Sequence, residues 1–449
     1  MEGVGPSPEE GLTWAERRRA EIQSHVSVFL LGILFALNGT GMINAVFLTC
    51  CAEEMGASTF QFSVIPALWC LSTFPIFFVA LWASRVRRVK ALCLWTMAGA
   101  SASGLAFCPA LLLPHSMGTA KVWALLGVSL VGHFICNVFF AGWFVWLPHF
   151  VRRGRMGQFQ SIRLLVLMAA TMLSHAFGGF FLGWFPGMRG FSGLFAIGAL
   201  AGFLALLPTA RIPEPVRTPP ASGSVRDAFR AVVRCRPLMR LFSYMILYNS
   251  VAMFAGVFPT VFMRKDLLIP YERLGLYTAL ASAGTLSATL AWGRLVDRFG
   301  GRPVMGVAGI GMVAVSFLWA LNAPGHIAAL PFAQFLSGVA QSAFSVSWLP
   351  LLYSLSPPAL RGMAGSLSFL TWGAPGAVSP FIGGQVVERL SGAHFRLMGI
   401  DMGSIHLLFL IQCLGFALCL PMLRFIRCAP PQTEGAGLDR PESRVTGTG

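Results

Sequence analysis

Long apolar stretches separated by short polar loops dominate this chain and limit what it can fold into. Each reaches about the 20 residues that an α-helix needs to cross ~30 Å of hydrocarbon. The twelve stretches are residues 26–49, 60–83, 91–113, 121–147, 161–185, 191–209, 239–263, 274–292, 303–322, 327–353, 362–387 and 403–427. Barrel strands alternate in polarity at every second residue, and these runs do not. The sequence therefore predicts an all-α membrane protein with twelve transmembrane helices.

The composition supports a membrane protein over a soluble one. Apolar residues make up 55% of the chain and charged residues 11%, whereas a soluble domain carries roughly 25% charged residues. The formal net charge of +16 could suggest a nucleic-acid partner. The basic residues, however, lie in short loops between apolar runs, as expected from the charge bias of membrane proteins. We therefore expect the lipid bilayer as a partner and no nucleic acid.

The same basic residues predict the orientation. If both termini are cytoplasmic, 26 of the 33 basic residues lie on the cytoplasmic side, which the positive-inside rule favours. The richness in Ala, Gly and Arg and the short loops are typical of a bacterial protein. We expect a multi-pass protein of the cytoplasmic (inner) membrane.

The longest break between apolar stretches divides the chain into two equal sets of six spans. The expected segments are a cytoplasmic N-terminal segment 1–25, an N-terminal bundle 26–209, a linker 210–238, a C-terminal bundle 239–427 and a disordered cytoplasmic tail 428–449. The linker begins rich in proline and then places Arg226, Arg230 and Arg234 four residues apart. That spacing fits a short basic helix lying on anionic headgroups. A solvated, disordered linker fits equally well.

A cationic, glycine-punctuated turn connects the eighth and ninth spans, over Gly293 to Pro303. It resembles the loop signature of the major facilitator superfamily, G-x-L-x-D-R-x-G-[RK]-[RK]. The matching residues are Gly293, Leu295, Asp297, Arg298, Gly300 and Arg302, whereas Gly301 stands at a basic position. The resemblance implies two pseudo-symmetric six-helix bundles and transport by alternating access.

The resemblance also implies a gate at the cytoplasmic face, where the loop aspartate of one half docks on the first turn of a helix from the other half. For Asp297 the partner is the start of the fifth span, Gly157 to Arg163. In the first half the equivalent loop begins Ser84-Arg85 and faces Arg361. Because Ser84 stands in place of the acid, we predict that the only acidic latch belongs to the second half. Arg163 is expected at the cytoplasmic mouth.

In the superfamily the first, fourth, seventh and tenth helices line a central cavity, and several polar or aromatic residues fall on these helices here. They are Asn38, Thr40, Asn44, His133, Asn137, Trp143, Tyr244, Tyr248, Asn249, Gln334, Gln341, Ser345 and Trp348. Water or a ligand in a cavity would satisfy such groups. Hydrogen bonds between helices would satisfy them as well. A lining of amides, phenols and indoles suits a neutral or zwitterionic organic solute.

The chain shows no enzyme motif and no paired cysteine spacing typical of a metal site. We expect no catalytic activity, cofactor or metal. All 17 acidic residues lie in termini, loops or span ends, which disfavours proton coupling through a buried carboxylate. His133 and His175 are the mid-span candidates for coupling, because histidine exchanges protons near neutral pH.

The leading hypothesis is a secondary active or facilitative transporter for a small solute, monomeric and open to coupling with H⁺ or Na⁺. Two alternatives remain at this point. The first is efflux of many lipophilic compounds, although His175 stands where drug exporters of this superfamily usually have proline. The second is a scaffold or sensor without transport.

Overall fold

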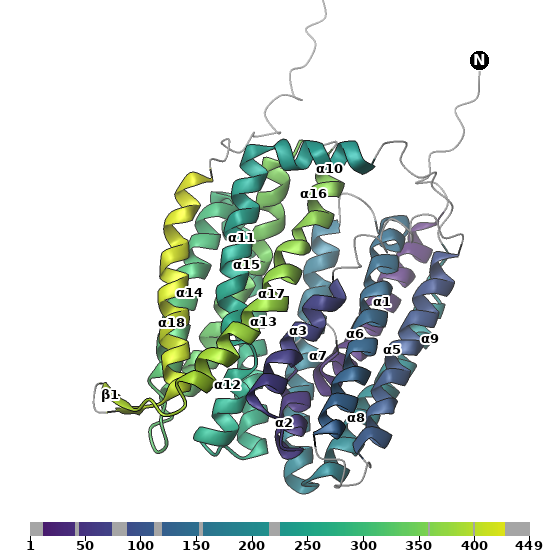
Figure 1. The fold of residues 1–449 in the computed structure, drawn as a ribbon. Helices are drawn as coiled ribbons and strands as arrows, with labels where there is room; N and C mark the ends of the chain where they lie inside the picture. The colour runs from purple at the N-terminus through teal and green to yellow at the C-terminus, as the bar shows by residue number, and fades with distance from the viewer. Residues whose placement is uncertain are drawn as a thin grey trace, which may run out of the picture.

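The computed structural model describes residues 12–40, 45–73, 88–111, 119–151, 156–214, 225–357, 360–397 and 400–426, and they are almost entirely helical (Figure 1). In the first half of the chain the elements are α1 (Trp14–Asn38), α2 (Val46–Glu54), α3 (Thr59–Thr73), α5 (Val89–Leu111), α6 (Ala120–Trp146), α7 (Met156–Trp184), α8 (Met188–Leu204) and α9 (Leu206–Ala210). A short helix, α10 (Val225–Arg234), precedes the second half.

The second half repeats the pattern of long helices. Its elements are α11 (Arg236–Ala255), α12 (Phe258–Val261), the π-helical turn η4 (Phe262–Asp266), α13 (Tyr271–Phe299), α14 (Gly301–Ala320), α15 (Ala329–Leu355), α16 (Arg361–Ser368), α17 (Leu370–Arg389), α18 (Ser404–Cys419) and the 3₁₀ turn η6 (Leu420–Phe425). An antiparallel hairpin, β1 (Phe395–Leu397) with β2 (Ile400–Met402), precedes α18.

Ten helical segments of the described residues are long and apolar enough to cross a membrane. The two remaining predicted spans correspond to α3, after which residues 74–87 lie outside the described residues, and to α16 with α17, which are separated at Phe369. The helix order therefore agrees with twelve transmembrane helices.

The first span differs from the prediction. It was expected over 26–49, but α1 begins at Trp14 and ends at Asn38, where Gly39 adopts a left-handed φ of 66°. Thr13 caps the helix, because its side chain accepts from the Glu16 backbone amide while the Glu16 carboxylate accepts from Thr13. This capping box starts the helix three turns before the apolar run begins. The Thr-x-x-Glu spacing at Thr13 and Glu16 was the sequence signal from which this start could have been predicted.

The linker contains the basic helix that the arginine spacing predicted. Along α10, Val232 is fully buried, whereas Arg226 and Arg230 are exposed. Phe229 and Val233 are also exposed. The disordered alternative is wrong for residues 225–234, and contact with headgroups stays a prediction. The expected tail 428–449 lies outside the described residues.

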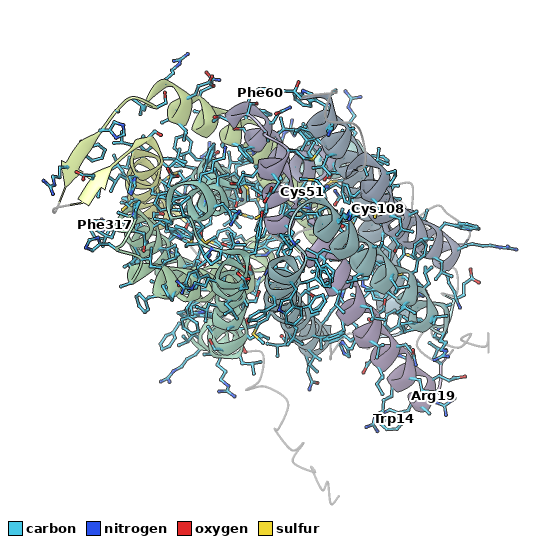
Figure 2. The ribbon with its side chains drawn as sticks, turned by 90° about the horizontal axis from the view of Figure 1, so that it is seen from below. Trp14, Arg19, Cys51, Phe60, Cys108 and Phe317 are labelled. Atoms are coloured by element: carbon cyan, nitrogen blue, oxygen red, sulfur yellow. The ribbon has the colours of Figure 1, made fainter. Side chains whose placement is uncertain are left out.

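The two halves lie side by side, the first coloured purple to blue and the second teal to yellow (Figure 1). We call the end with α10 the terminal end and the end with α2, α12 and β1 the distal end. Two helix pairs join the halves most extensively, α7 with α13 and α3 with α17. Seen from the distal end, Cys51 of α2 lies near the middle of the molecule and Phe317 of α14 at its edge (Figure 2).

Within the described residues, the apolar core is continuous between the halves at the distal end alone. One cluster of buried side chains combines first-half residues such as Phe47 and Phe191 with second-half residues such as Phe262 and Phe409. The other two clusters each belong to one half, one around Trp146 and one around Tyr248. The described halves therefore share a core at one end and keep separate cores at the other.

Candidate functional site

The two halves approach closely at a crossing of α7 and α13 near the distal end. A Cβ atom placed on Gly179 would lie 2.5 Å from the Tyr271 carbonyl oxygen and 2.8 Å from the Gly275 Cα. Glycine is required on both helices at this point, because real Cβ atoms do not approach so closely. The crossing holds the two halves together without intervening side chains, as small residues do in membranes.

A second crossing joins α3 and α17. Gly376 faces the Cys70 thiol and Gly384 faces the Ser63 hydroxyl at distances that leave no room for a Cβ atom. The rings of Trp69 and Trp372 meet edge to face with centroids 6.5 Å apart. Each crossing contains the second glycine of a Gly-Gly pair, Gly179 in α7 and Gly384 in α17.

Polar groups reinforce the distal contact. The Arg264 Nε lies 3.3 Å from the Glu53 Oε2, and both side chains are less than a fifth exposed. The Arg264 guanidinium also stacks 3.9 Å from the ring centroid of Tyr271, whose hydroxyl donates to Glu54 at 2.5 Å. Sequence reasoning assigned these residues to loops or span ends and missed their pairing. The adjacent acids Glu53 and Glu54, in a chain with few acidic residues, were the sequence signal that could have indicated this pairing.

The turn of the loop signature lies at the terminal end, between α13 and α14. Gly300 adopts a φ of 82°, which favours glycine, and α14 begins directly after it. A Cβ atom on Gly301 would lie 2.6 Å from the Ser347 carbonyl oxygen. This contact explains the departure from the signature, because a basic side chain at Gly301 would overlap α15.

The predicted latch is not formed in this conformation. Asp297 is exposed and makes no hydrogen bond or ion pair within the part of the chain that the structure describes. Its docking on the start of α7 therefore stays a prediction. Ser84 and Arg85 lie outside the described residues. Arg361 begins α16, and its side chain is not described.

The polar residues predicted to line a cavity in the first half pack between helices in this conformation. Asn38 donates to the Phe195 carbonyl oxygen at 3.1 Å, and Asn137 donates to the Ser72 hydroxyl at 2.6 Å. His133 Nδ1 lies 2.7 Å from the Ser129 carbonyl oxygen of its own helix. Asn38 and Asn137 therefore form hydrogen bonds between helices, which was the alternative to lining a cavity. Asn44 lies outside the described residues.

In the second half, two of the residues predicted to line the cavity lie in the apolar core, and a third forms a hydrogen bond to another helix. Tyr244 and Tyr248 are fully buried within the bundle, and Tyr248 stacks on Phe344 with ring centroids 4.2 Å apart. Asn249 donates to the Thr371 carbonyl oxygen at 3.1 Å. The tyrosine pair thus belongs to the apolar core, and neither hydroxyl has a hydrogen-bond partner in the structure.

The two glutamines of α15 lie in different surroundings. Gln334 is buried, with its Nε2 3.8 Å from the Met263 sulfur, whereas Gln341 is exposed. On the same helix Gly338 packs against α13 and Phe344 stacks on Tyr248 of α11. At 100° per residue Gln341 lies on the face between these two contacts. The partly buried Trp348 shares that face.

His175 and Arg163 are buried titratable residues of α7 without a hydrogen bond among the described residues. Both ring nitrogens of His175 are buried without a hydrogen bond, and the ring meets Phe47 edge to face. Arg163 is 9% exposed and its guanidinium lies 5.0 Å from the Trp143 ring centroid. Arg163 was expected at the mouth of the gate. It instead lies two turns inside α7, turned toward the bundle interior.

Among the described residues, no three His, Cys, Asp or Glu side chains group as a metal site. A surface hollow of about 420 Å³ opens at the terminal end of the second half, lined by Arg236, Met239, Arg240, Ser243, Met422 and Phe425.

Comparison with known proteins gives a family match over the second half of the chain and similar folds over most of it. The family model described as "Major Facilitator Superfamily" matches residues 240–445. No curated protein matches the sequence. A point mutant of the nucleoside transporter NupG is similar in structure, with a TM-score of 0.71 at 15% identity, covering 91% of this chain and 99% of that chain.

Two other solved structures are comparably similar. A bacterial homologue of the human lysosomal transporter Spinster, inward-facing and unoccupied, has a TM-score of 0.70 at 16% identity, covering 93% of this chain and 100% of that chain. A D-xylose–proton symporter has a TM-score of 0.69 at 17% identity, covering 91% and 98%.

Proposed function

We propose that this chain is a major facilitator superfamily protein and that it carries a small organic solute across a membrane by alternating access. The family model that matches residues 240–445 and the similar fold of solved transporters support this proposal. The solved structures it resembles include a nucleoside transporter and a sugar–proton symporter. The solute class proposed from the residues is a neutral or zwitterionic molecule.

The distribution of the apolar core carries this proposal. A core shared at the distal end, with two separate cores at the terminal end, is the arrangement of a two-bundle carrier closed on one side. The glycine crossings and the Arg264–Glu53 pair hold the closed side. Alternating access requires that these contacts open when the terminal end closes.

The distribution of basic residues supports a proposed orientation and membrane. With 26 of the 33 basic residues on the side of the termini, we propose that the terminal end is cytoplasmic and that the membrane is the bacterial inner membrane. The conformation is then inward-facing. We also propose that the protein is a monomer without enzymatic activity. Coupling to H⁺ or Na⁺ would use groups such as His133 and His175.

The test is solute uptake by the purified full-length protein in proteoliposomes. Vesicles are incubated with a defined mixture of sugars, nucleosides, amino acids, organic acids and lipophilic dyes, and their contents are analysed by mass spectrometry. We expect uptake of one small polar class above empty vesicles. Accumulation of dyes alone would favour efflux of lipophilic compounds, and no accumulation of any class would favour a scaffold. No observation favours either alternative.

A further inference from the structure

Arg163 is a buried cation with no counter-charge among the described residues. It is 9% exposed and forms no hydrogen bond or ion pair with them. Glu21, on the facing helix α1, makes no ion pair with it. An unpaired guanidinium inside a membrane bundle is strongly unfavourable, and such charges are usually retained for binding or transport.

Other polar atoms near Arg163 also lack partners. The indole Nε1 of Trp143, over which the guanidinium lies, is buried without an acceptor. The Nδ1 of His25 is likewise buried without a partner. Buried polar atoms without a hydrogen-bond partner are rare in folded proteins, so their grouping near Arg163 indicates a missing partner.

Aromatic rings connect these groups into one site. Phe150 contacts Trp143 with centroids 5.8 Å apart and Phe159 with centroids 6.1 Å apart. Phe159 in turn meets the His25 ring at 4.8 Å. The residues come from α1, α6, α7 and the segment after α6, all near the terminal end. The His25 side chain is partly exposed, whereas Trp143, Phe150 and Phe159 are buried.

The neighbouring Trp146 shows that the missing acceptor is specific to the site. Its Nε1 donates to the Pro213 carbonyl oxygen at 2.9 Å, within the same aromatic cluster. Trp143 lies one helical turn earlier and has no such partner. A ligand that satisfies Arg163, Trp143 and His25 together must offer several acceptor atoms and a negative charge. Carboxylate and phosphate groups have this chemistry, and a guanidinium binds them with two parallel hydrogen bonds.

We propose that Arg163, Trp143 and His25 bind the carboxylate or phosphate group of the solute that this protein transports. The inference rests on the proposed function and narrows it, because it selects zwitterionic and anionic solutes over neutral ones. The aromatic walls suit an apolar or planar body next to the anionic group. In the second half, Gln341 presents a neutral amide to the remainder of the solute.

Binding can be tested without transport, on the full-length protein in neutral detergent. Thermal unfolding is measured with benzoate, acetate and inorganic phosphate, and with benzamide as the neutral match of benzoate. We expect at least one oxyanion to raise the unfolding temperature and benzamide to have no effect. Arg163→Met should weaken oxyanion binding roughly 10- to 100-fold, because it removes hydrogen bonds to a charged group. Arg163→Lys, which keeps a point charge, should retain part of the affinity.

Controls separate a binding role from a structural one. Trp143→Phe keeps an aromatic ring and removes the unpaired Nε1 donor, so it should weaken oxyanion binding severalfold. Trp146→Phe should lower stability and leave oxyanion binding unchanged. Arg240→Met, an arginine removal in the other half, should leave binding unchanged. Equal responses to benzoate and benzamide, or no response to any oxyanion, would overturn the proposal. If Arg163→Met does not fold, the comparison of ligands on the unmodified protein decides.

The origin of the anion and the proposed function are tested separately. Titration with phosphatidylglycerol in place of the small oxyanions distinguishes a lipid headgroup from a solute, and stabilisation by the lipid alone would contradict a solute site. If proteoliposomes take up neutral solutes and Arg163→Met does not change that uptake, the result would support transport. It would contradict the inference that Arg163 binds the solute. Absence of all uptake, with oxyanion binding intact, would contradict transport and the assignment of the bound anion to a transported solute.

Discussion

At the scale of single residues, glycine determines how closely the helices approach. Gly179 and Gly301 each face a backbone carbonyl of another helix, so both positions exclude a side chain. Gly127 of α6, by contrast, has nothing within 4 Å of where a Cβ would stand. This difference permits matched substitutions.

Gly179→Ala should destabilise the protein by about 1 to 3 kcal/mol, as overpacking does in a close-packed interior. The added methyl would overlap Tyr271 and Gly275 of α13. Gly127→Ala should be neutral or slightly stabilising, because alanine favours a helix. Thermal unfolding of the two variants in the same detergent checks the difference. Equal unfolding temperatures would show that the crossing is not close-packed.

Gly301→Arg would restore the family signature and should still lower stability. The side chain would overlap the Ser347 carbonyl oxygen of α15, and the helices would have to separate. Phe299→Arg adds the same charge to the same turn at a site that is 56% exposed, and should have little effect. The yield of monodisperse protein and its unfolding temperature report the outcome. A Gly301→Arg variant as stable as the unmodified protein would contradict the steric explanation.

At the scale of elements, α2 connects the first half to the second through Glu53 and Arg264. Both side chains are largely buried, at 17% and 18% exposed. Removing either partner should favour opening of the distal end. A double-mutant cycle of Glu53→Gln and Arg264→Met should give a coupling energy of about 1 kcal/mol in stability. Additive effects of the two substitutions would indicate that the pair does not hold the halves together.

At the scale of the whole molecule, the predicted latch at Asp297 would make the gate asymmetric, because Ser84 replaces the acid in the first half. Asp297 should pair with the start of α7 only when the terminal end closes. Asp297→Asn should therefore reduce transport severalfold while leaving insertion and thermal stability unchanged. Asp401→Asn, in the exposed distal hairpin, serves as the control. Uptake rates in proteoliposomes measure the effect, and undiminished uptake by Asp297→Asn would count against the latch.

The sequence by itself determined the order and the approximate positions of the membrane spans. Lipid requires helices of a minimum length, so apolar runs and basic loops predicted the order of the spans. The turn at Gly300 was also readable, because few residue types satisfy its backbone conformation. The start of α1 was missed, since the capping box lies in polar sequence outside the apolar run.

Only the tertiary structure decided where each polar side chain points. A helix in lipid is apolar on most of its circumference, so periodicity does not reveal which face meets a neighbour. Tyr244 and Tyr248 share a face as predicted, and that face lies in the bundle core. Arg163, expected at the mouth, is buried against Trp143 for the same reason: burial depends on which helices converge, and their convergence is a property of the packed molecule.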